Sequence, residues 1–241
     1  MTRLTLLLLF FLAATAPTLA QEAFKPSVKV GGSVQVWMRY NQHNPGTLDA
    51  DGDAVSNGTD ISIRRARLTV TAQPSPRSQV YIQVGANNLV TTKKATMPFI
   101  HDAWASYELI PAGEGPVSLL MGGGLHFWNG FSRLSSGSYR SSILVDLPDI
   151  HLPNISRTDL AGRQMGIFAS GTASRLAFRF HLNKPYLYGD SLDITSSSRA
   201  QNLQSTHWAT GGHVAWEFLD REDQTRCYRT GTYLTPKRIL N

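Results

Sequence analysis

Residues 28–41 read VKVGGSVQVWMRYN, and this stretch decides the fold. Its even positions carry apolar side chains from Val28 to Tyr40, apart from Gly32, while Lys29, Gln35 and Arg39 occupy odd positions. Successive side chains of a β-strand point to opposite faces, so a period of two predicts a strand with one apolar and one polar face. The run is longer than the strands of soluble domains, which usually have about 3–10 residues.

The same alternation recurs along the rest of the chain. It covers residues 61–73, 78–88, 99–109, 117–125, 163–170, 176–183 and 206–219. Turn-forming residues follow several of these runs, at 74–76, 111–116, 171–174 and 220–224. A less regular strand ending near Leu234 and another beginning at Ile239 complete the pattern. We therefore predict an all-β antiparallel fold of about nine to ten strands.

The connections between these strands alternate in length. Short turns alternate with long polar segments at 42–60, 89–98, 126–162 and 184–205. Transmembrane β-barrels have short turns at one end and long loops at the other. Aromatic residues such as Tyr40 and Trp208 lie toward strand ends, as in the aromatic girdles of such barrels. The pattern predicts an antiparallel transmembrane β-barrel.

Composition excludes several other classes of protein. The chain has 241 residues and a net charge of +6, and its basic residues are scattered, so we expect no nucleic-acid partner. Its one cysteine, Cys227, cannot form a disulfide within the chain. We also expect no cofactor.

The first 20 residues have the layout of a secretory signal peptide. Arg3 supplies a positive charge, residues 4–14 are nearly all apolar, and residues 18–20 read TLA. The apolar run is shorter than the ~20 residues that span a membrane as a helix, so an anchor helix is the less favoured interpretation. We predict a cleaved signal peptide at 1–20 and an exported β-barrel domain at 21–241.

Three motifs together resemble a known family. IRRARL at 63–68, HDAWASY at 101–107 and LMGG at 120–123 resemble the N-terminal half of the phosphate-selective porin O and P family. The resemblance implies a bacterial outer-membrane barrel of about sixteen strands. It also implies a homotrimer that passes anions such as phosphate, or other small polar solutes, by passive diffusion without catalysis. Outer-membrane lipid and these solutes are then the expected partners.

The end of the chain departs from that family. Bacterial outer-membrane barrels typically finish with an amphipathic strand that ends in an aromatic residue, whereas residues 237–241 read KRILN. We therefore expect the chain to correspond to the first half to two thirds of a longer porin. An unpaired strand edge is not tolerated in hydrocarbon, so the alternatives are a small closed barrel or pairing with other chains.

Strand parity predicts which side chains line the pore. The polar face is predicted to be net positive, which favours anions, and guanidinium groups bind phosphate or carboxylate with paired donors. The alternative is that these charges pair across the lumen and stiffen its wall. The long 126–162 segment also offers two constriction-loop candidates, Arg133 and Arg140. The predicted pore-lining residues are Lys29, Arg39, Arg65, Arg67, Asp102, Glu108 and Arg179.

One acidic loop offers a weak metal-site candidate, formed by Asp49, Asp51 and Asp53. Clustered carboxylates at alternating positions suit hard cations. The sixth position of a calcium loop requires glycine, but Ala54 stands there. We therefore predict no metal site.

Two other classes of function stay open. A soluble exported β-sandwich could bind carbohydrate through Trp128 and Tyr139. A small outer-membrane barrel enzyme could use a serine and a histidine, and the candidates are Ser106 or Ser170 with His101 or His181. No established catalytic motif supports the enzyme.

Overall fold

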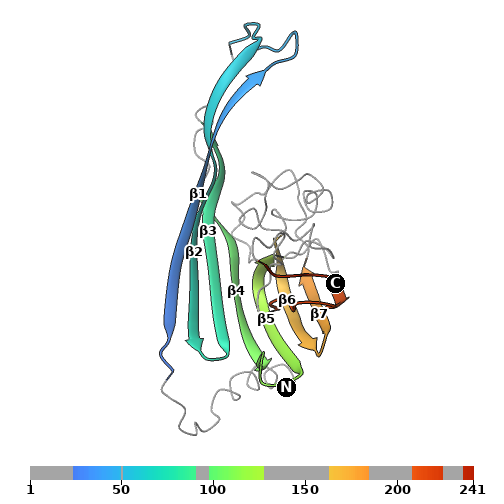
Figure 1. Ribbon diagram of the computed structural model, residues 1–241. Coiled ribbons are helices and arrows are strands. Elements are labelled where there is room, and N and C mark those ends of the chain that lie inside the picture. The colour runs from blue at the N-terminus through green and yellow to red at the C-terminus, as the bar shows by residue number, and fades with distance from the viewer. Residues whose placement is uncertain (1–23, 50, 91–97, 128–162, 185–207, 225–235) are drawn as a thin grey trace.

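The computed structural model describes residues 24–49, 51–90, 98–127, 163–184, 208–224 and 236–241. Within these residues the fold is one antiparallel sheet whose eight strands follow each other in chain order, with no helix (Figure 1). The described residues contain no helix long and apolar enough to cross a membrane. The strands are β1 (Ser27–Gln42), β2 (Asn57–Ser75), β3 (Ser78–Val90), β4 (Phe99–Ile110), β5 (Val117–Phe127), β6 (Arg163–Ala173), β7 (Leu176–Lys184) and β8 (Ala209–Trp216).

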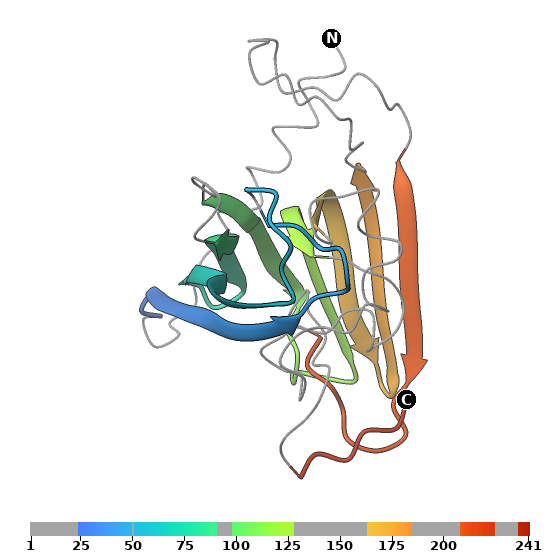
Figure 2. The ribbon, with the colours of Figure 1, turned by 90° about the horizontal axis from the view of Figure 1, so that it is seen from above.

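Among the described residues the sheet curves strongly but does not close. Each strand pairs with its sequence neighbours, and the edge strands β1 and β8 have one partner each. In Figure 2 the strands wrap around a common interior, with β1 and β8 on different sides of it. The all-β antiparallel prediction is thus confirmed, whereas closure into a barrel is not observed.

The strand count differs from the prediction at its C-terminal end. The less regular strand expected before Leu234 falls on residues 225–235, outside the described residues. The strand expected to begin at Ile239 is wrong, because residues 236–241 form no strand. Residues 220–224, expected to form a hairpin turn, instead fold onto the sheet, where Ser170 donates a hydrogen bond to the Gln224 carbonyl.

The first hairpin is longer than the rest of the sheet. Residues 57–61 of β2 pair with β1, whereas the pairing of β2 with β3 reaches only to Ser62. Figure 1 shows this hairpin rising beyond the other strands. The short turns between β2 and β3, β4 and β5, and β6 and β7 all lie at the opposite end of the sheet, which we call the turn end.

A β-bulge changes the alternation in β2. Val36 pairs with Ile63 and Gln35 pairs with Arg65, so Arg64 is the extra residue. Regular alternation would place Ile63 and Arg65 on one face. The bulge separates them, because one extra residue reverses the face on which the following side chains lie.

The two faces of the sheet are unequal in burial. Apolar side chains of the face that we call outer are exposed, for example Val34 at 66% and Met38 at 82%. The opposite, inner face carries the buried polar side chains, including Gln83, Asp102 and Ser170. Water-soluble domains show the reverse distribution.

The apolar core of the described residues is small and lies on the inner face. Trp104, Leu120 and Phe168 are buried together, and Tyr81 stacks on Trp104 with ring centroids 5.3 Å apart. Trp104 and Phe168 meet edge to face at 6.0 Å. Glycine at position 122 leaves room for this packing, because a Cβ there would overlap the Phe168 ring and lie 2.7 Å from the Ala105 carbonyl oxygen.

We predict that Gly122→Ala destabilises the sheet by about 1–3 kcal/mol, because the added methyl overpacks the aromatic cluster. The measurement is the urea midpoint of unfolding in detergent, followed by tryptophan fluorescence. Gly115→Ala is the matched control, since a Cβ at that turn position meets nothing within 4 Å. Equal midpoints for the two variants would contradict this packing.

Candidate functional site

The strand register places all of the predicted pore-lining residues on the inner face. In β1 and β2, Lys29 pairs with Thr71 and Arg67 pairs with Ser33. Asp102 pairs with Gln83. Across β4 to β7, Glu108 pairs with Leu120, Leu120 with Ser170, and Ser170 with Arg179. The inner face is therefore the candidate functional surface, and its regions differ in chemistry.

The β1–β2 end of the inner face is rich in guanidinium groups. Arg39 forms an ion pair with Asp60, its cross-strand partner. The guanidinium carbons of Arg39 and Arg64 lie 5.8 and 5.3 Å from the Trp37 ring centroid, which is cation–π range. Sequence parity alone could not place Arg64 beside Trp37, because its position results from the bulge.

Arg65 and Arg67 continue this basic surface toward β3. Arg65 donates a hydrogen bond to the Gln35 side chain at 2.9 Å. Arg67 donates to the Ala86 carbonyl at 2.7 Å and to the Asn87 side chain. These contacts fix the guanidinium groups on the sheet, so they form a preorganised cationic surface rather than mobile side chains.

Where β5, β6 and β7 end away from the turn end, the inner face holds a polar cluster around Asn183, which is 0% exposed. His126 Nε2 lies 2.9 Å from Asn183 Oδ1, and Asn183 Nδ2 donates to Gln164 at 3.0 Å. Asn183 Nδ2 also lies 2.7 Å from Nδ1 of His181. Because Nδ2 can only donate, this contact makes His181 Nδ1 an acceptor, and the Oδ1 contact makes His126 Nε2 a donor. One amide thus fixes the orientation of both rings.

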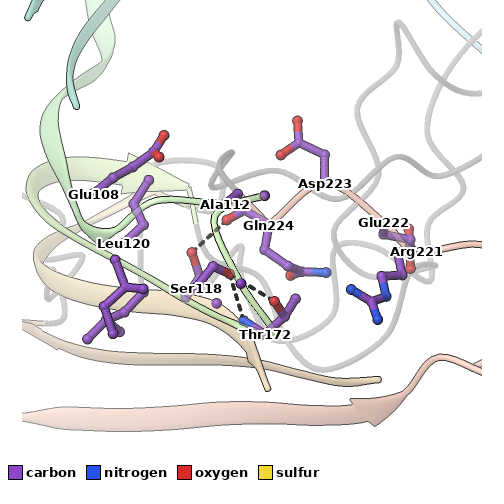
Figure 3. A pocket seen from close by; sticks show the side chains of 15 residues that line it. Glu108, Ala112, Ser118, Leu120, Thr172, Arg221, Glu222, Asp223 and Gln224 are labelled. Carbon is purple, nitrogen blue, oxygen red and sulfur yellow. Dashed lines mark hydrogen bonds between the residues drawn. The ribbon is translucent and has the colours of Figure 1, made fainter. Parts of the chain in front are cut away.

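The two predicted acidic residues have different surroundings. Asp102 is fully buried in the inner face, whereas Glu108 is half-buried and lines a cavity near the turn end. The cavity has a volume of about 200 Å³ and lies between β4–β6 and residues 221–224 (Figure 3). In its wall, Ser118 and Thr172 join their hydroxyl groups at 2.9 Å.

Arg179 lies under the chain that follows β8. Its side chain donates to the Gln224 side chain at 2.9 Å, and the residue is 4% exposed. A buried Arg179 cannot contact a solute on the inner face in this arrangement. The sequence offers no signal for this, since residues 220–224 read as an ordinary polar turn.

The acidic loop is organised by its own backbone. Asp49 Oδ1 accepts the backbone N–H groups of Asp51 and Asp53 at 3.0 and 2.9 Å. A bridge between Leu48 and Ala54 closes the loop. Among the described residues, no three His, Cys, Asp or Glu side chains are grouped to hold a metal ion.

Several predicted residues lie outside the described residues. They include the constriction-loop candidates Arg133 and Arg140, the loop aromatics Trp128 and Tyr139, and the predicted signal peptide at 1–20.

We predict that Asn183→Ala lowers the free energy of unfolding by about 2 kcal/mol or more, because the buried His126 and the partly buried Gln164 and His181 lose their hydrogen bonds to it. Urea unfolding in detergent measures this loss. Asn57→Ala makes the same chemical change at an exposed position and should shift stability by only about 0.5 kcal/mol. If the two variants behaved alike, the Asn183 cluster would contribute little to stability.

Comparison with known proteins adds no relative to this description: no family model, no curated protein and no solved structure matches the chain.

Proposed function

We propose that this chain forms the wall of an outer-membrane channel for passive diffusion of small hydrophilic solutes. The observation that carries the proposal is the inverted burial of the sheet, with exposed apolar side chains outside and buried polar side chains inside. A bilayer suits the outer face, because contact with lipid removes apolar surface from water. The inner face suits an aqueous passage, as in porins.

The open edges of the sheet favour a larger barrel. Unpaired backbone N–H and C=O groups are not tolerated in hydrocarbon, so β1 and β8 need further strands beside them. The resemblance to the phosphate-selective porin O and P family implies that the complete barrel has about sixteen strands. We propose that these eight strands belong to such a barrel, assembled as a homotrimer in the bacterial outer membrane after export.

The charge of the inner face favours anions. Arg39, Arg64, Arg65 and Arg67 lie within two neighbouring strands, and Arg39 forms an ion pair with Asp60. Guanidinium groups stay charged at any physiological pH and bind phosphate oxygens with paired donors. We therefore propose a preference for anions such as phosphate.

A soluble carbohydrate-binding sandwich is the first alternative. Such a fold packs two sheets face to face and buries their apolar faces. The described residues instead form one sheet whose apolar face is exposed. Purification without detergent separates the two proposals, since a barrel aggregates under that condition and a sandwich does not.

An outer-membrane barrel enzyme is the second alternative. The hydroxyl group of Ser170 donates to the Gln224 carbonyl at 2.6 Å, and His181 Nδ1 accepts from Asn183. Neither contact joins a serine nucleophile to a histidine base, which the chemistry requires. A serine-reactive phosphonate that labelled the folded protein would favour the enzyme.

We predict that Val36→Lys impairs membrane insertion, at a cost of roughly 2–4 kcal/mol if the residue faces the bilayer midplane. The measurement is the yield of folded protein in outer-membrane fractions. Gln79→Lys places the same charge on the inner face and should insert normally. Normal yield for Val36→Lys would mean that the outer face does not contact lipid.

We predict that Arg65→Ser combined with Arg67→Ser lowers the permeability ratio of anions to cations toward unity, because it removes two fixed cations from the inner face. Reversal potentials in planar bilayers under a salt gradient measure the ratio. Lys25→Ser with Arg77→Ser removes two exposed cations near the turn end and should leave the ratio unchanged. An unchanged ratio in the Arg65 and Arg67 variant would reject these residues as selectivity determinants.

A further inference from the structure

The chain leaves the sheet abruptly after β8. The N–H of Glu217 donates to the Arg175 carbonyl at 2.8 Å. The Arg175 side chain in turn donates to the carbonyls of Glu217 and Phe218 at 2.9 and 2.8 Å. These bonds fix the point where the chain turns, and residues 217–224, which we call the strap, follow it.

The strap crosses the inner faces of β6 and β7. The Ser170 hydroxyl donates to the Gln224 carbonyl at 2.6 Å. Arg179 Nε donates to the Gln224 side chain at 2.9 Å, and its Nη2 donates to the Asp223 carbonyl at 3.4 Å. Ser170, Arg179 and Gln224 are all buried by this arrangement.

Hydrogen bonds within the strap and hydrogen bonds to residues 236–241 stabilise the strap. Glu217 accepts the N–H of Glu222 at 2.9 Å, which closes a turn within the strap. The N–H groups of Phe218 and Asp220 donate to the carbonyls of Leu240 and Arg238 at 2.9 and 3.0 Å. The strap is therefore an ordered element with its own hydrogen-bonded partner segment.

The strap is held to the sheet by polar contacts rather than by apolar packing. Its large apolar side chains, Phe218 and Leu219, are exposed, and the cavity of about 200 Å³ remains between the strap and the sheet (Figure 3). When the strap separates from the sheet, water can replace its hydrogen bonds at a small net cost in free energy. Separating a segment with apolar side chains packed in a core would cost more.

We propose that the strap is a displaceable plug at the turn end of the inner face, which covers Arg179 and narrows the proposed passage. The covering of Arg179 by the strap does not depend on the proposed channel function. Only the expected effect of the strap on channel current rests on that proposed function. When the strap lifts away, Arg179 and Ser118 face the aqueous interior, so β7 adds an accessible guanidinium group to those of β1 and β2. The strap thereby controls access to one end of the surface that selects the solute.

Cysteine accessibility tests the strap directly. In a Cys227→Ser background, a reporter cysteine replaces Ser118, which lines the cavity beneath the strap. A second protein carries the reporter at Ser33, on the inner face of β1 and away from the strap. The rate of reaction with a charged, water-soluble methanethiosulfonate reagent is measured for both in detergent micelles.

We expect the Ser118 reporter to react slowly compared with the Ser33 reporter. Combining Ser170→Ala with Gln224→Ala removes two strap contacts and should speed the Ser118 reaction by about tenfold. Gln224→Glu gives Arg179 a charged acceptor and should slow it. The Ser33 rate should not change in any variant, and circular dichroism confirms that each variant retains its β-sheet.

Two results would overturn the proposal. The first is an equal reaction rate for the two reporters, or a Ser118 reporter rate that is the same with and without the strap substitutions. Either result would mean that the strap does not cover the inner face. The second is the expected labelling together with a channel current that Ser170→Ala and Gln224→Ala do not raise. The expected labelling with no current in any variant would support the strap and reject the channel.

Discussion

Backbone hydrogen bonding between neighbouring strands is the main interaction that stabilises the described sheet, because few apolar side chains of the described residues are buried in a core. The strands pair in chain order, and the buried apolar cluster of the inner face comprises Trp104, Leu120 and Phe168. The strands β1 and β8 form the edges of the described sheet, so each has one neighbouring strand there. An edge strand presents a row of backbone groups that can pair with a further strand.

The alternation of side chains made most of the sheet predictable from sequence. Between Val28 and Tyr40 a period of two, broken at Gly32 and Trp37, predicts both the strand and the chemistry of its faces, and the register agrees with it. Sequence alone could not locate the bulge at Arg64, because the residues of IRRARL do not indicate which arginine side chains lie on which face of the strand. The predicted face of Arg65 and Arg67 nevertheless holds, since both residues follow the bulge and pair with Gln35 and Ser33.

Contacts between distant segments could not be predicted in the same way. Residues 220–224 read DREDQ, a composition typical of a turn, and nothing local indicates that Gln224 contacts Ser170 and Arg179. Leu120 and Phe168 likewise break the polar pattern of the inner face, and only the glycine at position 122 hints that an aromatic ring needs space there. Local periodicity specifies the strand faces, whereas the chain's later path depends on tertiary hydrogen bonds.

The inner face combines a cationic region with regions that its own side chains occupy. Around β4 to β7, Asn183 joins two histidines, and the aromatic cluster and the strap fill the surface nearby. Along β1 and β2, Arg39 keeps 41% of its side chain exposed. The Arg39 guanidinium group is therefore accessible beside β1 and β2, whereas Arg179 is covered by the strap. The side of the inner face formed by β1 and β2 is thus cationic and accessible, whereas the side formed by β4 to β7 is occupied by its own side chains and by the strap. A passage along this face would therefore have two chemically different sides.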